Sequence, residues 1–178
     1  DPAFFEAERE AVFRKQWLNV GRVNRLPRTG SYFTRELPSA GPGTSVIIVK
    51  TKDGSVKAYH NVCRHRGMRV CTETEGSRRN FQCGYHAWTY DLDGKLIAAP
   101  NLTKMPDIDR DDYGLRKVHV REWLGYVWVC VAEQPPSFEE TVLSEIVTRL
   151  GEVESIDHYQ IDTLKIGKRI CYEVEANW

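Results

Sequence analysis

The chain has 178 residues, 41% of them hydrophobic, which is enough for one ordinary domain with a buried core. Lys and Arg together number 25, as do Asp and Glu, so the formal net charge is zero and favours neither nucleic acid nor an anionic membrane as a partner. The longest apolar stretch, Trp123–Ala132, is about ten residues long and too short to cross a bilayer.

Residues 1–20 open with a helical pattern. Asp1 can cap the first turn, and Pro2 suits the first helical position because an N–H there would have no partner in the helix. Phe5, Val12 and Phe13 recur near the helical period. We therefore expect an amphipathic helix whose apolar side packs on the body of the protein.

From Leu18 onward the chain changes to short apolar segments separated by turns, a pattern typical of β-structure. Hairpin turns are expected at Asp53-Gly54, Asp93-Gly94 and Leu124-Gly125. The expected strands cover residues 32–34, 46–49, 56–61, 80–82, 89–90, 95–97, 115–122 and 126–131. So many short strands with tight turns predict a mainly β (α+β) fold of small antiparallel sheets.

Between these strands lies a stretch with metal-ligand spacing. Cys63 and His65 form C-x-H, and seventeen residues later Cys83 and His86 form C-x-x-H. Zinc accepts two thiolates and two imidazoles, but zinc sites usually begin with two cysteines two to four residues apart. One Cys and one His from each segment suits a [2Fe–2S] cluster, in which two Cys hold one iron and two His hold the other. A zinc-bound interaction module remains the alternative.

The end of the chain predicts another helix. Ser137 and Glu140 match a capping box, S-x-x-E, and the apolar residues behind it recur every four positions to Leu150. Gly151 is a suitable helix terminator. Residues 169–175 then alternate as in a strand, and the chain ends in Ala-Asn-Trp at 176–178.

The two ligand segments resemble a known family. Residues 63–67 (CRHRG) and 83–88 (CGYHAW) are similar to the two ligand loops of Rieske proteins, whose oxygenase pattern is C-x-H-R-G and C-P-Y-H-G-W. More narrowly, the chain resembles the N-terminal portion of the α (large terminal oxygenase) subunit of Rieske non-haem iron ring-hydroxylating oxygenases. Gly84 stands where Pro is usual and Ala87 where Gly is usual. Neither departure removes a ligand.

The resemblance implies a Rieske fold with two cluster-binding loops, flanked by an N-terminal and a C-terminal helix. Cys63 and Cys83 would hold the inner iron of a [2Fe–2S] cluster, and His65 and His86 the outer iron. The residues expected around these ligands are Arg66, Gly67, Tyr85 and Trp88. Neutral imidazoles raise the potential of such a cluster, so it could accept an electron from a ferredoxin or flavin reductase.

The resemblance also implies a division of the chain. Residues 1–20 would be a helix at the edge of the catalytic domain, and 21–136 the Rieske domain. Residues 137–178 would lead into a catalytic domain that is absent from this sequence and that would hold a mononuclear Fe(II). We therefore expect no catalytic residue in this chain.

The function implied is electron entry into a ring-hydroxylating or related mono- or dioxygenase, with aromatic hydrocarbon catabolism as the expected setting. The alternative is a self-contained Rieske-type ferredoxin, which would resemble only the cluster-bearing middle of the chain. The full-length subunit is expected to be a homo-oligomer of the trimer type, with or without a β subunit.

Other chemically active residues have less to support a role. His60, His119 and His158 lack a second ligand at useful spacing and are expected to be structural or exposed. Cys71 is expected to be a packed thiol. With Cys130 and Cys171 it leaves an odd number of cysteines without framework spacing, which indicates free thiols in a reducing cytoplasm.

Five arginines lie close together in the sequence around the first ligand segment. They are Arg64, Arg66, Arg69, Arg78 and Arg79. One interpretation is a solvated surface partly paired with Glu73 and Glu75. The other is a docking face for an acidic electron donor, because steering depends on local rather than net charge.

Overall fold

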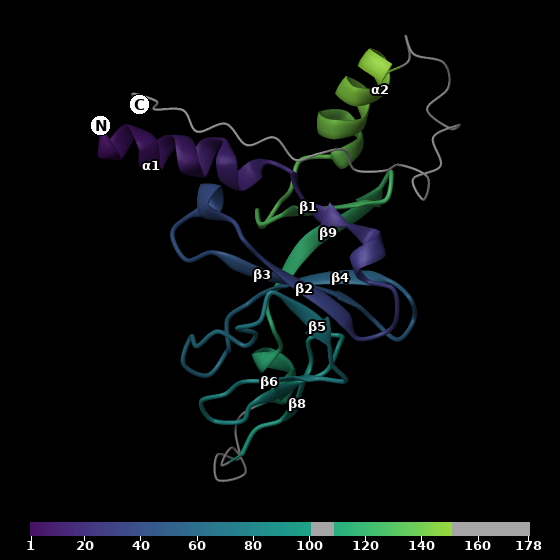
Figure 1. The fold of residues 1–178 in the computed structure, drawn as a ribbon. Helices are drawn as coiled ribbons and strands as arrows, with labels where there is room; N and C mark the ends of the chain where they lie inside the picture. The colour runs from purple at the N-terminus through teal and green to yellow at the C-terminus, as the bar shows by residue number, and fades with distance from the viewer. Residues whose placement is uncertain (101–108, 151–178) are drawn as a thin grey trace.

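A seven-stranded antiparallel sheet forms the centre of the computed structural model, which describes residues 1–100 and 109–150 (Figure 1). In spatial order its strands are β1 (Leu18–Arg22), β10 (Tyr126–Cys130), β9 (Lys117–Trp123), β4 (Val56–His60), β3 (Ser45–Lys50), β2 (Ser31–Glu36) and β5 (Glu75–Ser77). A second sheet contains β6 (Phe81–Gln82), β7 (Thr89–Tyr90) and β8 (Leu96–Ala98), and lies at the opposite end of the molecule from the two helices (Figure 1). The predicted mainly β fold with two helices is confirmed.

Strand β3, in the interior of the large sheet, is buried on both faces. Ile47 and Val49 belong to the core shared with the second sheet, whereas Val46 and Ile48 belong to the core on the other side. All four side chains are 0% exposed. This position explains the uninterrupted apolar run in the sequence, because successive residues of a strand point to opposite faces and here both faces need apolar side chains.

The three predicted hairpin turns are confirmed. Gly54 and Gly94 have φ of 84° and 76°, which glycine adopts without a steric penalty. The turn between β9 and β10 joins Trp123 directly to its partner Tyr126. Its two central residues, Leu124 and Gly125, have φ of 48° and 68°, as a type I′ turn requires.

The N-terminal helix α1 (Pro2–Ala11) is shorter than predicted. Asp1 caps it as expected, because its Oδ1 accepts a hydrogen bond of 2.9 Å from the N–H of Ala3. The expectation that its apolar side packs on the body is wrong for the described residues. No residue of α1 is buried, and Phe4 and Phe5 are 65% and 53% exposed.

The reason lies in the residues that face the 3₁₀ turn at Pro38–Ala40 (η3). Arg14, in a 3₁₀ turn at Phe13–Lys15, donates from Nε to the carbonyl of Ala40 at 2.9 Å, and the side chain of Arg9 is only 13% exposed. Arginine side chains are long enough to fill the space beneath a helix, so α1 rests on its basic side and its phenylalanines point outward.

The second helix begins close to the predicted position. The Ser137 hydroxyl accepts a hydrogen bond of 3.2 Å from the N–H of Glu140, which is one half of the predicted capping box. The first turn, Glu139–Leu143, is a π-helix and continues as α2 (Ser144–Leu150). The predicted terminator Gly151 and the strand at 169–175 lie outside the described residues.

An aromatic cluster holds this helix start against the sheet. Phe138 is 3% exposed, and its ring centroid lies 5.2 Å from that of Trp17 and 5.8 Å from that of Trp128. The indole N–H of Trp17 donates to the carbonyl of Pro136 at 2.9 Å. In the described residues, no helix combines the length and apolarity needed to cross a membrane.

Candidate metal centre

The first ligand loop leaves β4 and is closed by the side chain of one buried residue, Asn61, which is 1% exposed. Its Nδ2 donates to the carbonyl of Cys71 at 2.7 Å. Its Oδ1 accepts from the N–H groups of Cys71 at 2.8 Å and Val70 at 3.1 Å. One amide therefore joins the two ends of the loop. No motif in the sequence indicated a role for Asn61, although a polar side chain directly after a buried strand is a usable signal.

Backbone hydrogen bonds give the loop its shape. The N–H of Cys63 donates to the carbonyl of Met68 at 2.7 Å, and the N–H of Gly67 donates to the carbonyl of Cys63 at 3.0 Å. Gly67 has φ of 72°, a conformation that glycine adopts readily. This accounts for glycine at the end of the CRHRG segment.

The second ligand loop repeats this pattern. The N–H of Cys83 donates to the carbonyl of Trp88 at 2.8 Å, and the N–H of Ala87 donates to the carbonyl of Cys83 at 3.0 Å. Ala87 has φ of 56°. Each Cys therefore opens a loop of the same backbone geometry, which places the two sulfurs in equivalent positions.

The two thiols lie side by side in the core between the sheets. Cys63 is 3% exposed and Cys83 is 2% exposed. Burial raises the pKa of the Cys63 thiol; a hydrogen bond with Tyr90 counteracts this effect, and the adjacent Cys83 thiol adds to it. The thiol is therefore poorly solvated and lies within hydrogen-bonding reach of the other sulfur.

The two imidazoles form the outer part of the same site. The ring centroids of His65 and His86 lie 4.6 Å apart. The ring of His65 stacks on Trp88 at 4.8 Å with only 9° between the planes. His65 itself is exposed and His86 is half-buried. The site therefore has a buried pair of sulfurs and an outer pair of rings.

Tyr90 connects this site to β7 and is fully buried. Its hydroxyl lies 3.3 Å from Sγ of Cys63 and accepts a hydrogen bond of 3.0 Å from the N–H of Arg64. Burial, and then the Cys63 sulfur, raise the pKa of the phenol, so it keeps its proton and can donate to the sulfur. The sequence placed Tyr90 on a strand but indicated no role for it.

A family model for the Rieske [2Fe–2S] domain matches residues 16–118, which include both ligand loops and most of the large sheet. The chain belongs to the Rieske [2Fe–2S] domain family.

Relatives of this Rieske domain include oxygenase subunits. It is 32% identical over 180 residues to the glycine betaine monooxygenase oxygenase subunit of Pseudomonas aeruginosa, covering 100% of this chain and 39% of the relative. It is 29% identical to the biphenyl 2,3-dioxygenase subunit alpha of Rhodococcus jostii, covering 100% of this chain and 37% of the relative. The chain therefore spans well under half the length of these relatives.

A solved structure supports the fold. The apo form of the quaternary ammonium Rieske monooxygenase CntA matches with a TM-score of 0.73 and 31% sequence identity. The match covers 83% of this chain and 41% of CntA. The arrangement of the two sheets is thus one that a Rieske monooxygenase uses.

The pairing of the donor atoms fits a Rieske cluster. The four candidate ligands pair two by two, sulfur with sulfur and ring with ring. A cluster of two irons needs two protein ligands on each, and when bound it supplies one-electron transfer.

The residues expected around the ligands differ in their surroundings. Trp88 is buried beneath the ring of His65, and the edge of its indole contacts Tyr113 with 5.7 Å between centroids. Tyr85 is 57% exposed, although its ring lies 3.8 Å from that of His86. Arg66 is exposed and has no hydrogen bond or ion pair within the described part of the chain.

The arginine group divides into paired and unpaired members. Arg69 pairs with Glu36 at 2.8 Å and Arg78 with Glu73 at 2.7 Å. The expected partner Glu75 pairs with Arg25 instead. In the described ranges, Arg64, Arg66 and Arg79 form no ion pair, so part of the group keeps uncompensated charge.

The remaining candidates are not members of the four-residue site, although His60 lines a hollow together with Cys63. Cys71 is a packed thiol as expected, and burial raises its pKa to about 12. His119 contacts the carbonyl of Glu133 through Nε2 at 3.3 Å. His60 is half-buried at the end of β4. His158 and Cys171 lie outside the described residues.

Proposed function

We propose that Cys63, His65, Cys83 and His86 hold the Rieske cluster, and that the chain is the electron-entry portion of an oxygenase α subunit. An electron from a ferredoxin or flavin reductase would enter at the cluster. It would then leave toward a mononuclear Fe(II) in a part of the subunit beyond this chain. Such an iron needs open positions beside its protein ligands, which the four residues of this site do not provide.

The observation that carries this proposal is the extent of the similarity. The Rieske model ends at residue 118, but both oxygenase relatives align over 100% of the chain. Residues 1–15 and 119–178 are therefore also similar to oxygenase subunits. A self-contained ferredoxin is less well supported, because only its cluster-bearing part would be shared.

For the substrate of the complete protein, we favour a quaternary ammonium compound over an aromatic hydrocarbon. The relative named for glycine betaine is 32% identical, against 29% for the one named for biphenyl, and the matched CntA structure is named for quaternary ammonium compounds. This choice rests on similarity alone, because the expected substrate pocket belongs to the catalytic domain.

The proposed entry point for the electron is the surface around His65. Met68 and Tyr85 are 50% and 57% exposed there, and Arg66 carries an unpaired charge. An apolar centre beside basic residues suits an acidic protein donor, because charge speeds encounter and the apolar residues exclude water.

The domain limits follow from the same proposal. Residues 1–20 would form the edge of the catalytic domain, residues 21–136 the Rieske domain, and residues 137–178 the segment that leads into the catalytic domain. Phe4 and Phe5, which are exposed in this chain, would then be covered by the catalytic domain in the complete subunit. We also propose a cytoplasmic homo-oligomer of the trimer type, with or without a β subunit.

The test begins with metal and sulfide analysis of the purified chain. Two irons and two sulfides per chain are expected, with an absorption spectrum that bleaches on reduction. Cys63→Ser should abolish the colour, whereas Cys71→Ser, which alters a buried thiol outside the ligand set, should keep it. Stoichiometric zinc without iron would refute the ligand assignment.

A second measurement tests whether the chain transfers electrons without hydroxylating a substrate. Supplied with reductant, O₂, ferrous iron and a panel of quaternary ammonium and aromatic compounds, the chain should be reduced and reoxidised without hydroxylating any of them. Multiple-turnover hydroxylation by these 178 residues would contradict the proposal.

A further inference from the structure

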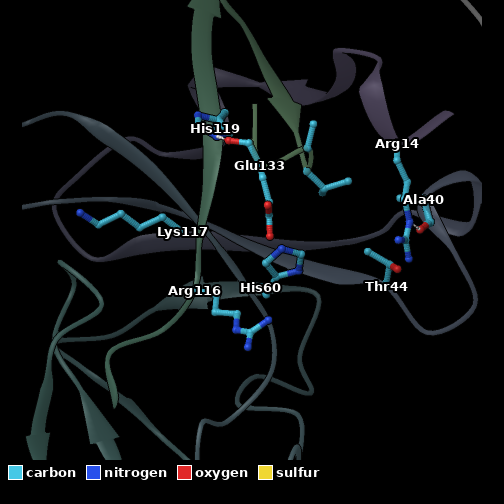
Figure 2. A pocket seen from close by; sticks show the side chains of 10 residues that line it. Arg14, Ala40, Thr44, His60, Arg116, Lys117, His119 and Glu133 are labelled. Carbon is cyan, nitrogen blue, oxygen red and sulfur yellow. Dashed lines mark hydrogen bonds between the residues drawn. The ribbon is translucent and has the colours of Figure 1, made fainter. Parts of the chain in front are cut away.

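A hollow beside the large sheet lies outside the four candidate ligands (Figure 2). Its volume is about 470 Å³, within the range of small-ligand sites. Residues from five separate segments of the chain meet there. Its polar lining residues include Arg14, Thr44, His60, Arg116, Lys117 and Glu133.

Positive charge lines one part of the hollow. Arg14 is held in place by Ala40 and by an ion pair with Glu10 at 2.7 Å. Arg116 has no hydrogen bond or ion pair from its side chain within residues 1–100 and 109–150. Its backbone carbonyl accepts from the N–H of His60 at 2.9 Å, so the guanidinium extends from a fixed point.

The charges of these arginines affect the pKa of His60. Burial is the first cause that lowers its pKa, and the charges of Arg116 and Arg14 are the next two. Positive potential from both arginines therefore reaches the same half-buried ring.

A carboxylate enters the hollow from the other side. In Figure 2 the side chain of Glu133 points toward the ring of His60, while its backbone carbonyl is fixed by His119. The carboxylate of Glu133 makes no ion pair of 4.0 Å or less with any described cation. The hollow thus holds one free guanidinium and one free carboxylate that do not reach each other.

We propose that this hollow binds a small zwitterion, with its carboxylate on Arg116 and its cationic group on Glu133. A guanidinium offers two parallel N–H donors that match a carboxylate, and Glu133 offers the acceptor for an ammonium group. The Thr44 hydroxyl is a further donor on the same wall. A simple anion would gain from Arg116 but would be repelled by Glu133, so a ligand with both charges is favoured.

The probes are the ω-amino acids from glycine to 5-aminopentanoate, each compared with the carboxylic acid and the amine of the same length. Binding to the cluster-loaded chain is measured by isothermal titration calorimetry at low salt. At least one amino acid should bind about tenfold more tightly than either matched compound, the factor that corresponds to 1.4 kcal/mol.

Variants separate the two ends of the site. Arg116→Gln should weaken the binding of both the amino acid and the carboxylic acid, because both use the guanidinium. The amino acid should then bind no more tightly than the matched amine. Glu133→Gln should weaken the binding of the amino acid. The carboxylic acid should bind as tightly as before or more tightly. Arg110→Gln and Glu122→Gln, exposed charges outside the hollow, serve as controls. All four positions are exposed, so folding should persist.

Two results would overturn the proposal. One is an amino acid series in which no member exceeds its matched acid and amine. The other is equal binding by the Arg116 and Glu133 variants and their controls. Neither result would bear on the cluster or on electron transfer, so the proposed zwitterion site and the proposed function are tested independently.

Discussion

Ala87 occupies in the second ligand loop the position that Gly67 occupies in the first. Each donates its N–H to the carbonyl of the loop's Cys at 3.0 Å, and each has a positive φ. An L-residue with a side chain is strained there by roughly 1–2 kcal/mol, whereas glycine is not. The second loop is therefore built on a residue that its backbone disfavours.

We expect Ala87→Gly to stabilise the chain by about 0.5–1 kcal/mol, since the extra freedom of glycine in the unfolded chain offsets part of the relieved strain. Gly67→Ala should destabilise by a similar amount, and through strain alone, because a Cβ there would meet nothing within 4 Å. Urea unfolding of the two variants should show shifts of opposite sign; shifts of the same sign would contradict the equivalence of the loops.

The hairpin between β9 and β10 offers a second stabilising change. Leu124 has φ of 48° in a turn that favours Asn at this position. Leu124→Asn should raise the free energy of unfolding by about 1 kcal/mol, because Asn tolerates the left-handed conformation better. Leu124→Val should lower it, since β-branched residues fit positive φ poorly. Thermal unfolding of both variants provides the measurement.

Tyr90 should influence the reduction potential. Its hydroxyl lies 3.3 Å from Sγ of Cys63. A cluster-bound sulfur carries no proton, so the phenol would be the donor, and a hydrogen bond to a ligand sulfur favours the more negative, reduced cluster. Tyr90→Phe should lower the potential by about 20–60 mV, which corresponds to one hydrogen bond of 0.5–1.5 kcal/mol. Redox titration of the loaded protein gives the shift.

The matched control for that prediction is Tyr59→Phe. Tyr59 is also buried, but its hydroxyl donates to the carbonyl of Leu92 at 3.3 Å and not to a candidate ligand. Removal of the Tyr59 hydroxyl should leave the reduction potential of the cluster unchanged. Equal shifts in both variants would mean that Tyr90 acts only through packing.

Asn61 should matter for the order of the first loop. Asn61→Ala would leave Cys71 and Val70 with buried N–H groups that lack a partner, at a cost of about 1–3 kcal/mol for each such group. We expect a fall in thermal midpoint together with faster loss of iron to a chelator. Asn80→Ala, at an exposed position, should change neither quantity. Normal iron retention in the Asn61 variant would show that the loop is held by other contacts.

The unpaired arginines should control the encounter with an acidic donor. Charge reversal at Arg66 and Arg79 together should slow reduction by such a donor at low salt, and added salt should narrow the difference from the unmodified chain. Stopped-flow reduction supplies the rates. Arg110→Glu, a charge reversal at an exposed arginine away from the site, is the control and should not change the rate. Rates that do not depend on salt or on these residues would leave them as ordinary surface.

The parts predicted well from the sequence are those in which a local rule decides the outcome. Gly54 and Gly94 follow Asp in turns that require positive φ, so the hairpins could be located. The apolar run at 46–49 could only be a strand buried on both faces or a short buried segment. The spacing of the four candidate ligands indicated a shared centre because each segment supplied one Cys and one His.

The parts that were missed depend on partners distant in the chain. β5 contains Glu75, Gly76 and Ser77, which are all exposed and have no strand pattern. It forms because β2 offers its edge, and because Gly76 lets the backbone lie against the ring of Tyr32, where a Cβ would approach to 3.1 Å. The packing of α1 on its arginines, and the contact between Tyr90 and Cys63, likewise become visible only after folding.

The burial of β3 on both faces has a consequence for how the molecule comes apart. If this strand separates from β2 or β4, Ile47 and Val49 leave one core at the same moment as Val46 and Ile48 leave the other. Neither core can then melt as an independent subdomain. The cysteine-bearing end and the helix-bearing end are thermodynamically one cooperative unit, and the amides of β3 should exchange with solvent only through global unfolding.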